Sequence, residues 1–192
     1  MNDLTKIACY NNIIYDFDRT IAIIDADWTG WHDYVEKLFK SYDPDVIYPR
    51  STEIHRLQNV IVKKFGNEVS KKMSDFNREY EFSHIKTIIP NTELINFIKK
   101  NLAKNQYIVS NQNRLLLNKL LDELDIKRFF KKIVTRDDVL FIKPDPEGLL
   151  KIINNSKNLS DFIYVGDAKV DEDVAKEVGI AFENILMDLK KE

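Results

Sequence analysis

Short apolar runs rich in β-branched and aromatic residues alternate along the chain with segments that repeat apolar residues at helical spacing. The runs at 13–15, 107–109, 133–134 and 162–165 have the length and composition of buried strands. Helical spacing recurs at 94–102, 116–124 and 170–178, and the last of these segments ends at Gly179, a plausible residue just beyond a helix. Strand and helix in alternation predict an α/β fold, with a parallel sheet covered by helices on both faces.

The stretch 22–89 breaks this alternation, because it contains no convincing strand. Apolar residues at helical spacing instead predict three helices, over 28–39, over 54–65 ending at Gly66, and over 69–80. We therefore expect a helical insertion after the first strand. The predicted domains are an α/β core of residues 1–21 and 90–192 and an α-helical cap of residues 22–89.

Polar residues directly follow the predicted strands. Asp16 follows the first run, Ser110 the second and Asp167 the last. The carboxyl ends of parallel strands meet at one edge of a sheet, where ligands bind, so these three side chains should converge. Lys143 follows another short apolar run, and Asp145 behind it is a candidate N-cap that would place Lys143 beside the same edge.

This collection of side chains suits phosphoryl chemistry. Asp16, Asp18, Asp167 and Asp171 would raise one another's pKa at close range unless a cation neutralised them. Carboxylates without cysteine or histidine favour a hard, oxygen-seeking ion, which predicts Mg²⁺ as the cofactor. One ammonium group and one hydroxyl nearby could hold the remaining oxygens of a phosphoryl group.

Four motifs, taken in order, resemble those of the haloacid dehalogenase-like superfamily. The run IIYDFDRT at 13–20 resembles its DxDxT signature, Val109-Ser110-Asn111 its second motif, Lys143-Pro144 its third, and GDAKVD at 166–171 its fourth, GDxxxD. The resemblance spans roughly residues 12–180 and is strongest to the phosphoglycolate phosphatase-like branch, which carries a small helical cap between the first two motifs. It implies a Rossmann-like core. The pattern differs at Arg19, where glycine is common.

The resemblance also implies roles for individual residues. Asp16 would be the nucleophile that becomes an aspartyl-phosphate, and Asp18 would protonate the leaving alcohol and then activate water. Ser110 and the Asn111 backbone would bind phosphoryl oxygens. Thr20 would support the loop that carries Asp16 and Asp18, and would belong to the phosphate site. Lys143 would orient the nucleophile and neutralise charge. The set implied for the metal is Asp16, the main-chain carbonyl of Asp18, and Asp167, with Asp171 in a second shell.

The sequence therefore predicts a Mg²⁺-dependent phosphatase of small phosphomonoesters. Asp18 counts against dehalogenation, because a halide leaving group needs no proton. Two alternatives stay open: a phosphomutase of sugar phosphates on the same core, and a non-catalytic module that binds a phosphorylated ligand. Phosphoglycolate, sugar phosphates, nucleotides and pyrophosphate all stay open as substrates, because the cap selects among them.

Composition and charge limit the classes of molecule expected to bind this protein. The 192 residues are 44% hydrophobic and 31% charged, with a formal net charge of −2, so neither a nucleic acid nor an anionic membrane is expected as a partner. Cys9 is the only cysteine, which excludes a disulfide framework. No apolar run is long enough to span a membrane, and we expect a soluble, cytoplasmic protein that acts on a small phosphorylated metabolite.

Cap residues carry no motif. We interpret His32, His55 and His84 as surface or packing histidines, and Trp28 and Trp31 as core residues of the cap. The cap is expected to be a mobile lid over the site that reads the leaving group. Arg50, His55 and Arg56 could meet an anionic substrate, and Arg50 and Arg56 are the first candidates for meeting a second anionic group.

Overall fold

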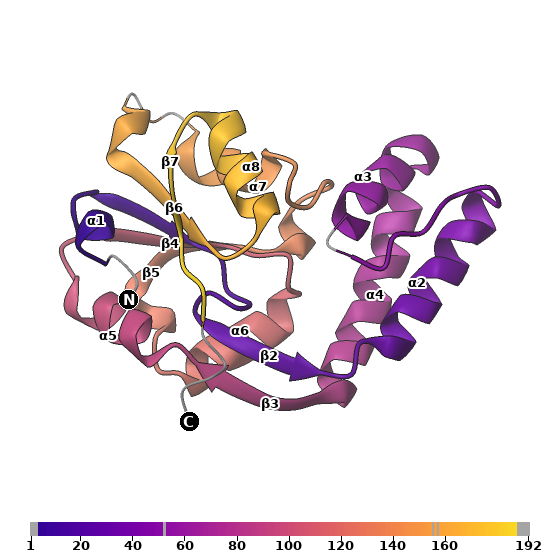
Figure 1. Ribbon diagram of the computed structural model, residues 1–192, viewed down its shortest axis with the longest axis horizontal. Helices are drawn as coiled ribbons and strands as arrows, with labels where there is room; N and C mark the ends of the chain where they lie inside the picture. The colour runs from indigo at the N-terminus through magenta and orange to yellow at the C-terminus, as the bar shows by residue number, and fades with distance from the viewer. Residues whose placement is uncertain (1–3, 52, 155, 157, 188–192) are drawn as a thin grey trace.

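The computed structural model describes residues 4–51, 53–154, 156 and 158–187, which form two parts (Figure 1). One part is an α/β core. The other is a unit of three helices, α2 (Thr29–Tyr42), α3 (Ile54–Phe65) and α4 (Asn67–His84), joined to the core by β2 (Ala22–Ala26) and β3 (Ile85–Pro90).

The core contains a five-stranded parallel sheet in the order β5-β4-β1-β6-β7. Its strands are β1 (Asn12–Tyr15), β4 (Asn105–Val109), β5 (Phe130–Val134), β6 (Phe162–Gly166) and β7 (Ala181–Asn184). The first four are the predicted buried runs. The last is an edge strand, which pairs with β6 between Ile163 and Gly166.

Helices cover both faces of this sheet, as predicted, because successive strand residues point to opposite sides. Ile13 and Tyr15 of β1 pack into one apolar cluster, whereas Ile14 between them packs into another. The first cluster includes side chains of α1 (Leu4–Ala8), α5 (Thr92–Lys100) and α6 (Arg114–Glu123). The second includes side chains of α7 (Glu147–Ile153) and α8 (Lys169–Val178), and α8 ends at Gly179 with φ 76°.

Three short 3₁₀ helices complete the core: η1 (Lys127–Phe129), η2 (Arg136–Asp138) and η3 (Leu159–Asp161). Helix α7 begins at Glu147, one residue later than the sequence suggests, and the Asp145 carboxylate still accepts a hydrogen bond from the Glu147 backbone N–H at 2.9 Å. The loop from η2 to α7 carries Lys143 to the carboxyl edge of the sheet.

The three-helix unit has an apolar core of its own. Val35 and Phe39 of α2, Ile61 of α3, and Val69 and Met73 of α4 are at most 1% exposed and pack in one cluster. The predicted spacing of apolar residues is therefore confirmed for all three helices. Gly66 separates α3 from α4 with φ 90°, in the region that favours glycine.

The expectation that residues 22–89 lack a strand is wrong at both ends of the stretch. β2 and β3 pair antiparallel in a separate two-stranded sheet, with Ile23 opposite Ile89 and Ile24 opposite Ile88. Ile24 and Ile88 pack into the apolar cluster of the core rather than that of the helices. The main sheet accordingly resumes at β4 and not near residue 88, because β3 pairs with β2. No helix among the described residues is long and apolar enough to cross a membrane.

Candidate active site

The carboxyl ends of β1, β4 and β6 bring the predicted polar residues together. The Asp16 backbone N–H donates to the Val165 carbonyl at 2.8 Å, which extends the pairing of β1 with β6 by one residue. Ser110 is held in the same way beyond β4, since its N–H donates to the carbonyl of Val134 at 3.0 Å. Asp167 follows β6 directly. All three side chains line one cavity, so the convergence predicted from strand ends is confirmed.

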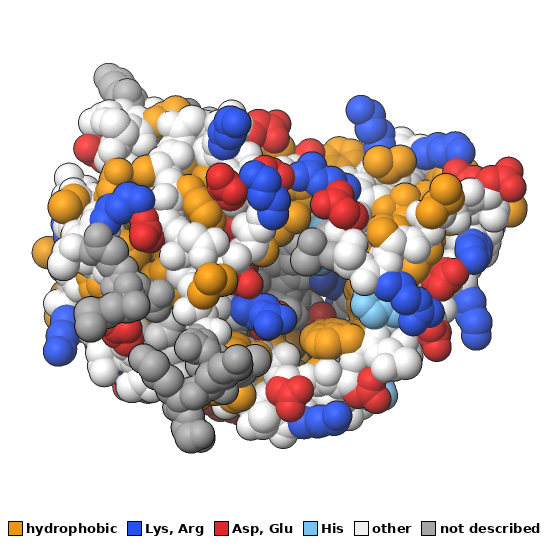
Figure 2. Space-filling view, in the orientation of Figure 1, with side chains coloured by type: hydrophobic (Ala, Val, Ile, Leu, Met, Phe, Trp, Pro, Cys, Tyr) orange, Lys and Arg blue, Asp and Glu red, His pale blue; other side chains and the backbone are white. Residues whose placement is uncertain are grey.

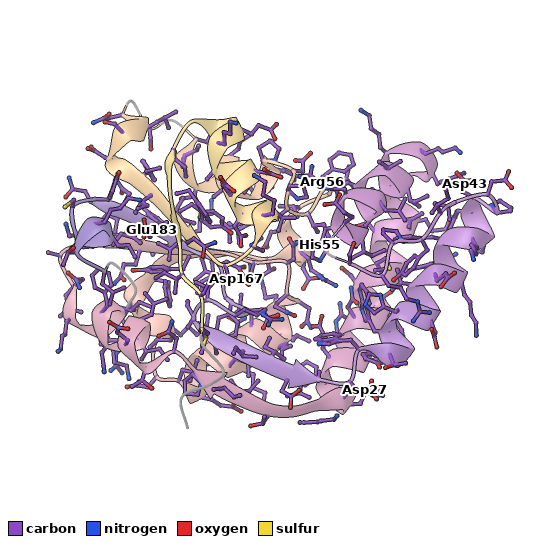
Figure 3. All side chains as sticks on the ribbon, in the orientation of Figure 1. Asp27, Asp43, His55, Arg56, Asp167 and Glu183 are labelled. Atoms are coloured by element: carbon purple, nitrogen blue, oxygen red, sulfur yellow. The ribbon has the colours of Figure 1, made fainter. Side chains whose placement is uncertain are left out.

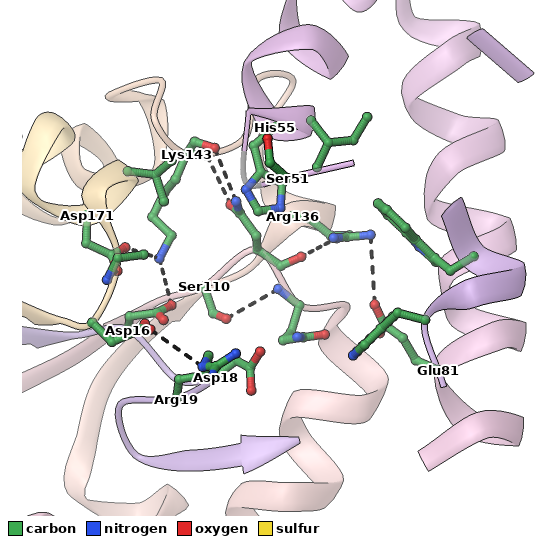
Figure 4. A pocket seen from close by; sticks show the side chains of 18 of the residues that line it. Asp16, Asp18, Arg19, Ser51, His55, Glu81, Ser110, Arg136, Lys143 and Asp171 are labelled. Atoms are coloured by element: carbon green, nitrogen blue, oxygen red, sulfur yellow. Dashed lines mark hydrogen bonds and ion pairs between the residues drawn. The ribbon is translucent and has the colours of Figure 1, made fainter. Parts of the chain in front are cut away.

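Lys143 lies at the centre of this group (Figure 4). Its ammonium nitrogen is 2.6 Å from Asp16 Oδ1, 2.6 Å from Asp171 Oδ1 and 2.7 Å from the Tyr164 hydroxyl, and the side chain is 4% exposed. We refer to Asp16, Lys143, Tyr164 and Asp171 as the carboxylate–lysine network. Sequence reasoning missed Tyr164, because a tyrosine within an apolar run reads only as a strand residue.

The network shifts the titration of its members. Burial raises the pKa of Asp16 well above its usual range; the Lys143 ammonium lowers it, and the charges of Asp171 and Asp167 raise it further. Burial opposes the charge on Lys143, but Asp16 and Asp171 outweigh that effect and raise its pKa. Burial, then Asp171 and Asp18, raises the pKa of Asp167 to about 6. An additional positive charge here would favour the ionised forms of Asp16 and Asp167.

The donor set fits a divalent cation. Carboxylate oxygens of Asp16, Asp167 and Asp171 all lie within 4.8 Å of one another. Three carboxylates against the single ammonium of Lys143 leave an excess of negative charge in a buried place, which hard cations with oxygen ligands neutralise. Asp171, expected behind the metal ligands, lies in the same cluster, with one oxygen bonded to Lys143 and the other 3.2 Å from the Ala168 N–H.

Asp18 and Thr20 occupy different surroundings on the loop after β1. Asp18 lines the cavity, and its Oδ1 accepts a hydrogen bond from the Ile24 N–H at 2.9 Å. Burial raises the pKa of Asp18, against the opposing effect of that hydrogen bond. Thr20 is fully buried and is not among the residues that line the cavity; its hydroxyl has no partner among the described residues. The structure therefore places Thr20 behind the loop, which it supports through its carbonyl, an acceptor for Asn91 Nδ2 at 3.0 Å.

Asn111 ties the loop after β4 to the Lys143 loop. Its side chain forms both hydrogen bonds of an amide pair with the backbone of Lys143, accepting from the N–H at 3.0 Å and donating to the carbonyl at 3.2 Å. The backbone carbonyl of Asn111 accepts a bond from Arg136 Nε. Beside it, Ser110 Oγ accepts a bond from the Gln112 N–H at 3.3 Å. These contacts fix the position of Lys143 relative to Ser110.

The cavity has a volume of about 370 Å³ and opens between the core and the three-helix unit (Figures 2 and 3). Asp167 faces it from the core and His55 from α3 (Figure 3). Besides the residues already described, the core contributes Arg19, Gln112 and Arg136. The helical side contributes Trp28, Trp31, His32, Ser51, Ile54, His55 and Glu81.

Several of these lining residues are ones that the sequence assigned to packing. Trp31 is 8% exposed and belongs to the apolar cluster of the helices, as predicted, yet Trp31 and Trp28 also line the cavity. His55 lines it too, although a surface or packing role was its default expectation. Arg136 comes two residues after the end of β5, so a rule that includes the residues just beyond each strand could have found it.

The two arginines expected to meet the substrate lie elsewhere. Arg50 pairs with Asp33 at 2.6 Å on the exposed side of α2, and it is not among the residues that line the cavity. Arg56 of α3 pairs with Asp173 of α8, across the junction of the two parts. A second contact at this junction is made by Asn59, whose amide donates to the Ile142 carbonyl at 2.7 Å and accepts from the Ile142 N–H at 3.0 Å.

Arg19 lies at the edge of the cavity with φ 60°, in the left-handed region where glycine is favoured. Its N–H donates to the Ala22 carbonyl at 2.7 Å, and its guanidinium is 3.9 Å from the Asp167 carboxylate. The turn that needs this backbone conformation carries the chain from Asp16 into β2. The residue that replaces glycine here therefore brings a positive charge to the mouth of the cavity.

Comparison with known proteins matches this site to one family. A sequence model of the haloacid dehalogenase-like hydrolases matches residues 13–185. A phosphoglycolate phosphatase of Pseudomonas syringae pv. syringae is 30% identical over 109 residues, which cover 55% of this chain and 40% of that protein. A phosphoglycolate phosphatase of Pseudomonas fluorescens is 31% identical over 108 residues, which cover 55% and 39%. The match thus spans less than half the length of these relatives.

Solved structures share the fold. A protein from Bacteroides fragilis classed as a haloacid dehalogenase-like hydrolase superposes with a TM-score of 0.60 at 24% identity, covering 90% of this chain and 86% of that one. A protein from Lactobacillus plantarum classed as a phosphoglycolate phosphatase gives a TM-score of 0.54 at 14% identity, covering 90% and 84%. Both likenesses extend over the core and the three-helix unit, since each covers nine tenths of the chain.

Proposed function

The chain belongs to the haloacid dehalogenase-like hydrolase family, and from this premise we propose that it hydrolyses small-molecule phosphomonoesters through an aspartyl-phosphate intermediate. The observation that carries the proposal is the contact of Lys143 with Asp16, at 2.6 Å, in a cavity that Asp18 and Ser110 also line. A nucleophile, a candidate acid and donors for the phosphoryl oxygens therefore meet in one place.

In the first step, a carboxylate oxygen of Asp16 attacks phosphorus. Lys143 holds Oδ1, which leaves Oδ2 as the attacking atom. As the new phosphorus–oxygen bond forms, the bond to the leaving alcohol breaks, and Asp18 donates a proton to that oxygen. The raised pKa of Asp18 supports this role, because it favours the protonated form before the reaction.

In the second step, water attacks the phosphorus of the aspartyl-phosphate and the bond to Asp16 breaks. Asp18, now ionised, accepts the proton of the water and returns to its starting state. Ser110 and the backbone at Asn111 would donate hydrogen bonds to the phosphoryl oxygens, and Lys143 would stabilise their negative charge in both steps.

Mg²⁺ is the cation we propose for the carboxylate cluster. Asp16, the main-chain carbonyl of Asp18, and Asp167 would hold it, with Asp171 alongside. Bound there, the ion would neutralise the carboxylates and the phosphoryl oxygens, so that an anionic nucleophile can approach an anionic substrate. The oxygen-only donor set supports this choice over a softer metal.

We further propose that residues 22–89 act as the cap, with β2 and β3 as its stem. The placement of Trp28, Trp31 and His55 along the cavity supports a role in reading the leaving group. A small phosphorylated metabolite fits a cavity of about 370 Å³.

The test is a panel of phosphorylated metabolites incubated with purified protein and Mg²⁺, with released phosphate as the readout. We expect turnover with Mg²⁺ and none after chelation. Hydrolysis in ¹⁸O-labelled water should place one label in each released phosphate, whereas a phosphomutase would retain the phosphoryl group on the sugar. Activity that is equal with and without metal would contradict the assignment of the carboxylate cluster.

A further inference from the structure

One wall of the cavity carries a buried guanidinium group. Arg136 begins η2, two residues beyond the end of β5, and its side chain is 8% exposed. Its Nε donates to the carbonyl of Asn111, the residue after Ser110. The guanidinium group is therefore one hydrogen bond away from the loop proposed to bind the phosphoryl group, and Arg136 lines the cavity (Figure 4).

Arg136 has a counter-charge but an unused donor. The Glu81 carboxylate of α4 lies 3.9 Å from its Nη1, too far for a hydrogen bond. The Glu81 carboxylate already accepts a hydrogen bond from Asn113 Nδ2. The amide nitrogen of Gln112 can also lie 3.2 Å from both carboxylate oxygens. Nη1 of Arg136 is buried without a hydrogen-bond partner among the described residues. A buried donor left in this state is costly, and a ligand acceptor would recover that cost.

A second unused nitrogen lies on the helical side. His55 of α3 lines the same cavity, and its Nδ1 is buried without a partner among the described residues. His55 and Arg136 come from different parts of the molecule and line the same cavity (Figure 4). Burial, and then the positive charges of Arg136 and Lys143, lower the pKa of His55 to about 4. A bound anion would oppose that effect.

We propose that Arg136 and His55 together bind a carboxylate on the leaving group and so determine which phosphomonoesters the enzyme selects. We call these two residues the donor pair. The proposal rests on the phosphatase function proposed above and assigns its specificity to residues on both sides of the cavity.

The geometry favours a carboxylate over other acceptors. A carboxylate has two oxygens and can accept from both members of the donor pair, whereas one hydroxyl would leave a donor unfilled. Glu81 stands beside Arg136, so a second phosphate with two charges would meet stronger repulsion than a carboxylate with one. The bond from Arg136 to Asn111 requires the carboxylate to lie only a few atoms from the phosphorus.

The test compares two esters that differ only in this group: 2-phosphoglycolate, which ends in a carboxylate, and 2-hydroxyethyl phosphate, which ends in a hydroxymethyl group. For the wild type, we expect kcat/KM to be higher for the carboxylate ester. Arg136→Gln should lower kcat/KM for that ester by about 100-fold, because it removes a charged donor to a buried group. Any loss caused through the missing bond from Arg136 to Asn111 should be common to all esters, so the selective effect is measured as the change in the ratio of kcat/KM for the carboxylate ester to kcat/KM for 2-hydroxyethyl phosphate. His55→Gln should act in the same direction, with a smaller loss of about tenfold.

Folding is controlled separately, because Arg136→Gln leaves Glu81 without its counter-charge. The double variant Arg136→Gln/Glu81→Gln removes both charges and should show the same selective loss. Activity on p-nitrophenyl phosphate, which has no carboxylate, reports whether the phosphoryl site is intact in each variant. Equal losses on both esters would overturn the proposal, as would a wild type that shows no preference for the carboxylate ester while hydrolysing both. If the wild type hydrolyses none of the three esters with Mg²⁺, the phosphatase function itself fails, and the donor pair with it.

Discussion

The carboxylate–lysine network and the donor pair lie along the same cavity but differ in how completely their polar atoms are bonded. The ammonium group of Lys143 lies within 2.7 Å of three protein oxygens. Arg136 Nη1 and His55 Nδ1 meet no hydrogen-bond partner among the described residues. The network is therefore arranged in advance for a reaction step, whereas the donor pair is completed only by a ligand. Reaction and selection are thus assigned to separate groups, which mutations should be able to separate.

The largest expected effect is at the nucleophile. Asp16→Asn should lower kcat on the order of 10⁴-fold for every ester, because the amide oxygen cannot form the aspartyl-phosphate. Mass spectrometry after rapid quenching should detect no phosphoenzyme in this variant. Asp18→Asn is the matched control on the same loop: it keeps the nucleophile, and its residual rate should depend strongly on the pKa of the leaving alcohol. Substantial turnover of an alkyl phosphate by the Asp16→Asn variant would contradict the covalent mechanism.

The second effect tests how much the carboxylate–lysine network depends on the ammonium group of Lys143. Lys143→Met should abolish turnover and lower the free energy of unfolding by about 3 kcal/mol in metal-free buffer at pH 8, because Asp16 and Asp171 lose their buried partner. Urea denaturation measures the change. Lys169→Met is the control, since Lys169 pairs with Glu172 on the surface and is 68% exposed; there we expect less than about 1 kcal/mol. Equal effects at the two lysines would contradict the central position of Lys143.

The third effect concerns the donor pair and pH. The folded protein holds the pKa of His55 at about 4, below its ordinary value of 6.5. Between these values the unfolded chain binds a proton that the folded protein excludes, so acid lowers the free energy of unfolding. From pH 7.5 to pH 4.5 the loss due to His55 should be about 2 kcal/mol. It is measured as the difference between wild type and His55→Gln in denaturant unfolding at both pH values. Parallel pH profiles for the two proteins would show that His55 is not held neutral.

The smallest effect is expected outside the cavity. Arg50 forms exposed ion pairs with Asp33 and Glu36, and its side chain is 53% exposed. Arg50→Gln should therefore change the free energy of unfolding by less than about 1 kcal/mol and kcat/KM by less than about twofold on either ester. Compared with Arg136→Gln, this variant shows whether the loss of any arginine lowers kcat/KM for the carboxylate ester. If Arg50→Gln caused a selective loss as large as that of Arg136→Gln, the carboxylate would not be bound by the donor pair.

The two regions also differ in how far the sequence predicts them. Asp16, Ser110 and Asp167 could be placed together because each directly follows an apolar run, and parallel strands align their carboxyl ends. Lys143 could be placed beside them by its proline-containing helix start. This part of the site depends on local sequence and on one rule of sheet geometry, and the structure brings these four residues to one cavity.

The donor pair could be predicted only in part. Arg136 comes two residues after the end of β5, so a rule that includes the residues just beyond each strand applies to it, but nothing local distinguishes it from a surface arginine. The environments of His55 and Glu81 depend on how α3 and α4 pack against the core, which helical spacing does not specify. β2 and β3 were missed for a related reason: each has only a short isoleucine pair, and their pairing spans sixty residues of intervening helices.

The double hydrogen bond between Asn59 and Ile142 acts as a mechanical coupling. It joins α3, which carries His55, to the residue next to Lys143, so the helix cannot swing outward without first releasing the lysine loop. At about 1 kcal/mol for each bond, the two together make the released state roughly 30-fold less populated than it would be without them. If residues 22–89 act as the proposed cap, opening the cavity would require the loop beside Lys143 to relax in the same event. A single asparagine would thereby couple access to the cavity to the position of Lys143.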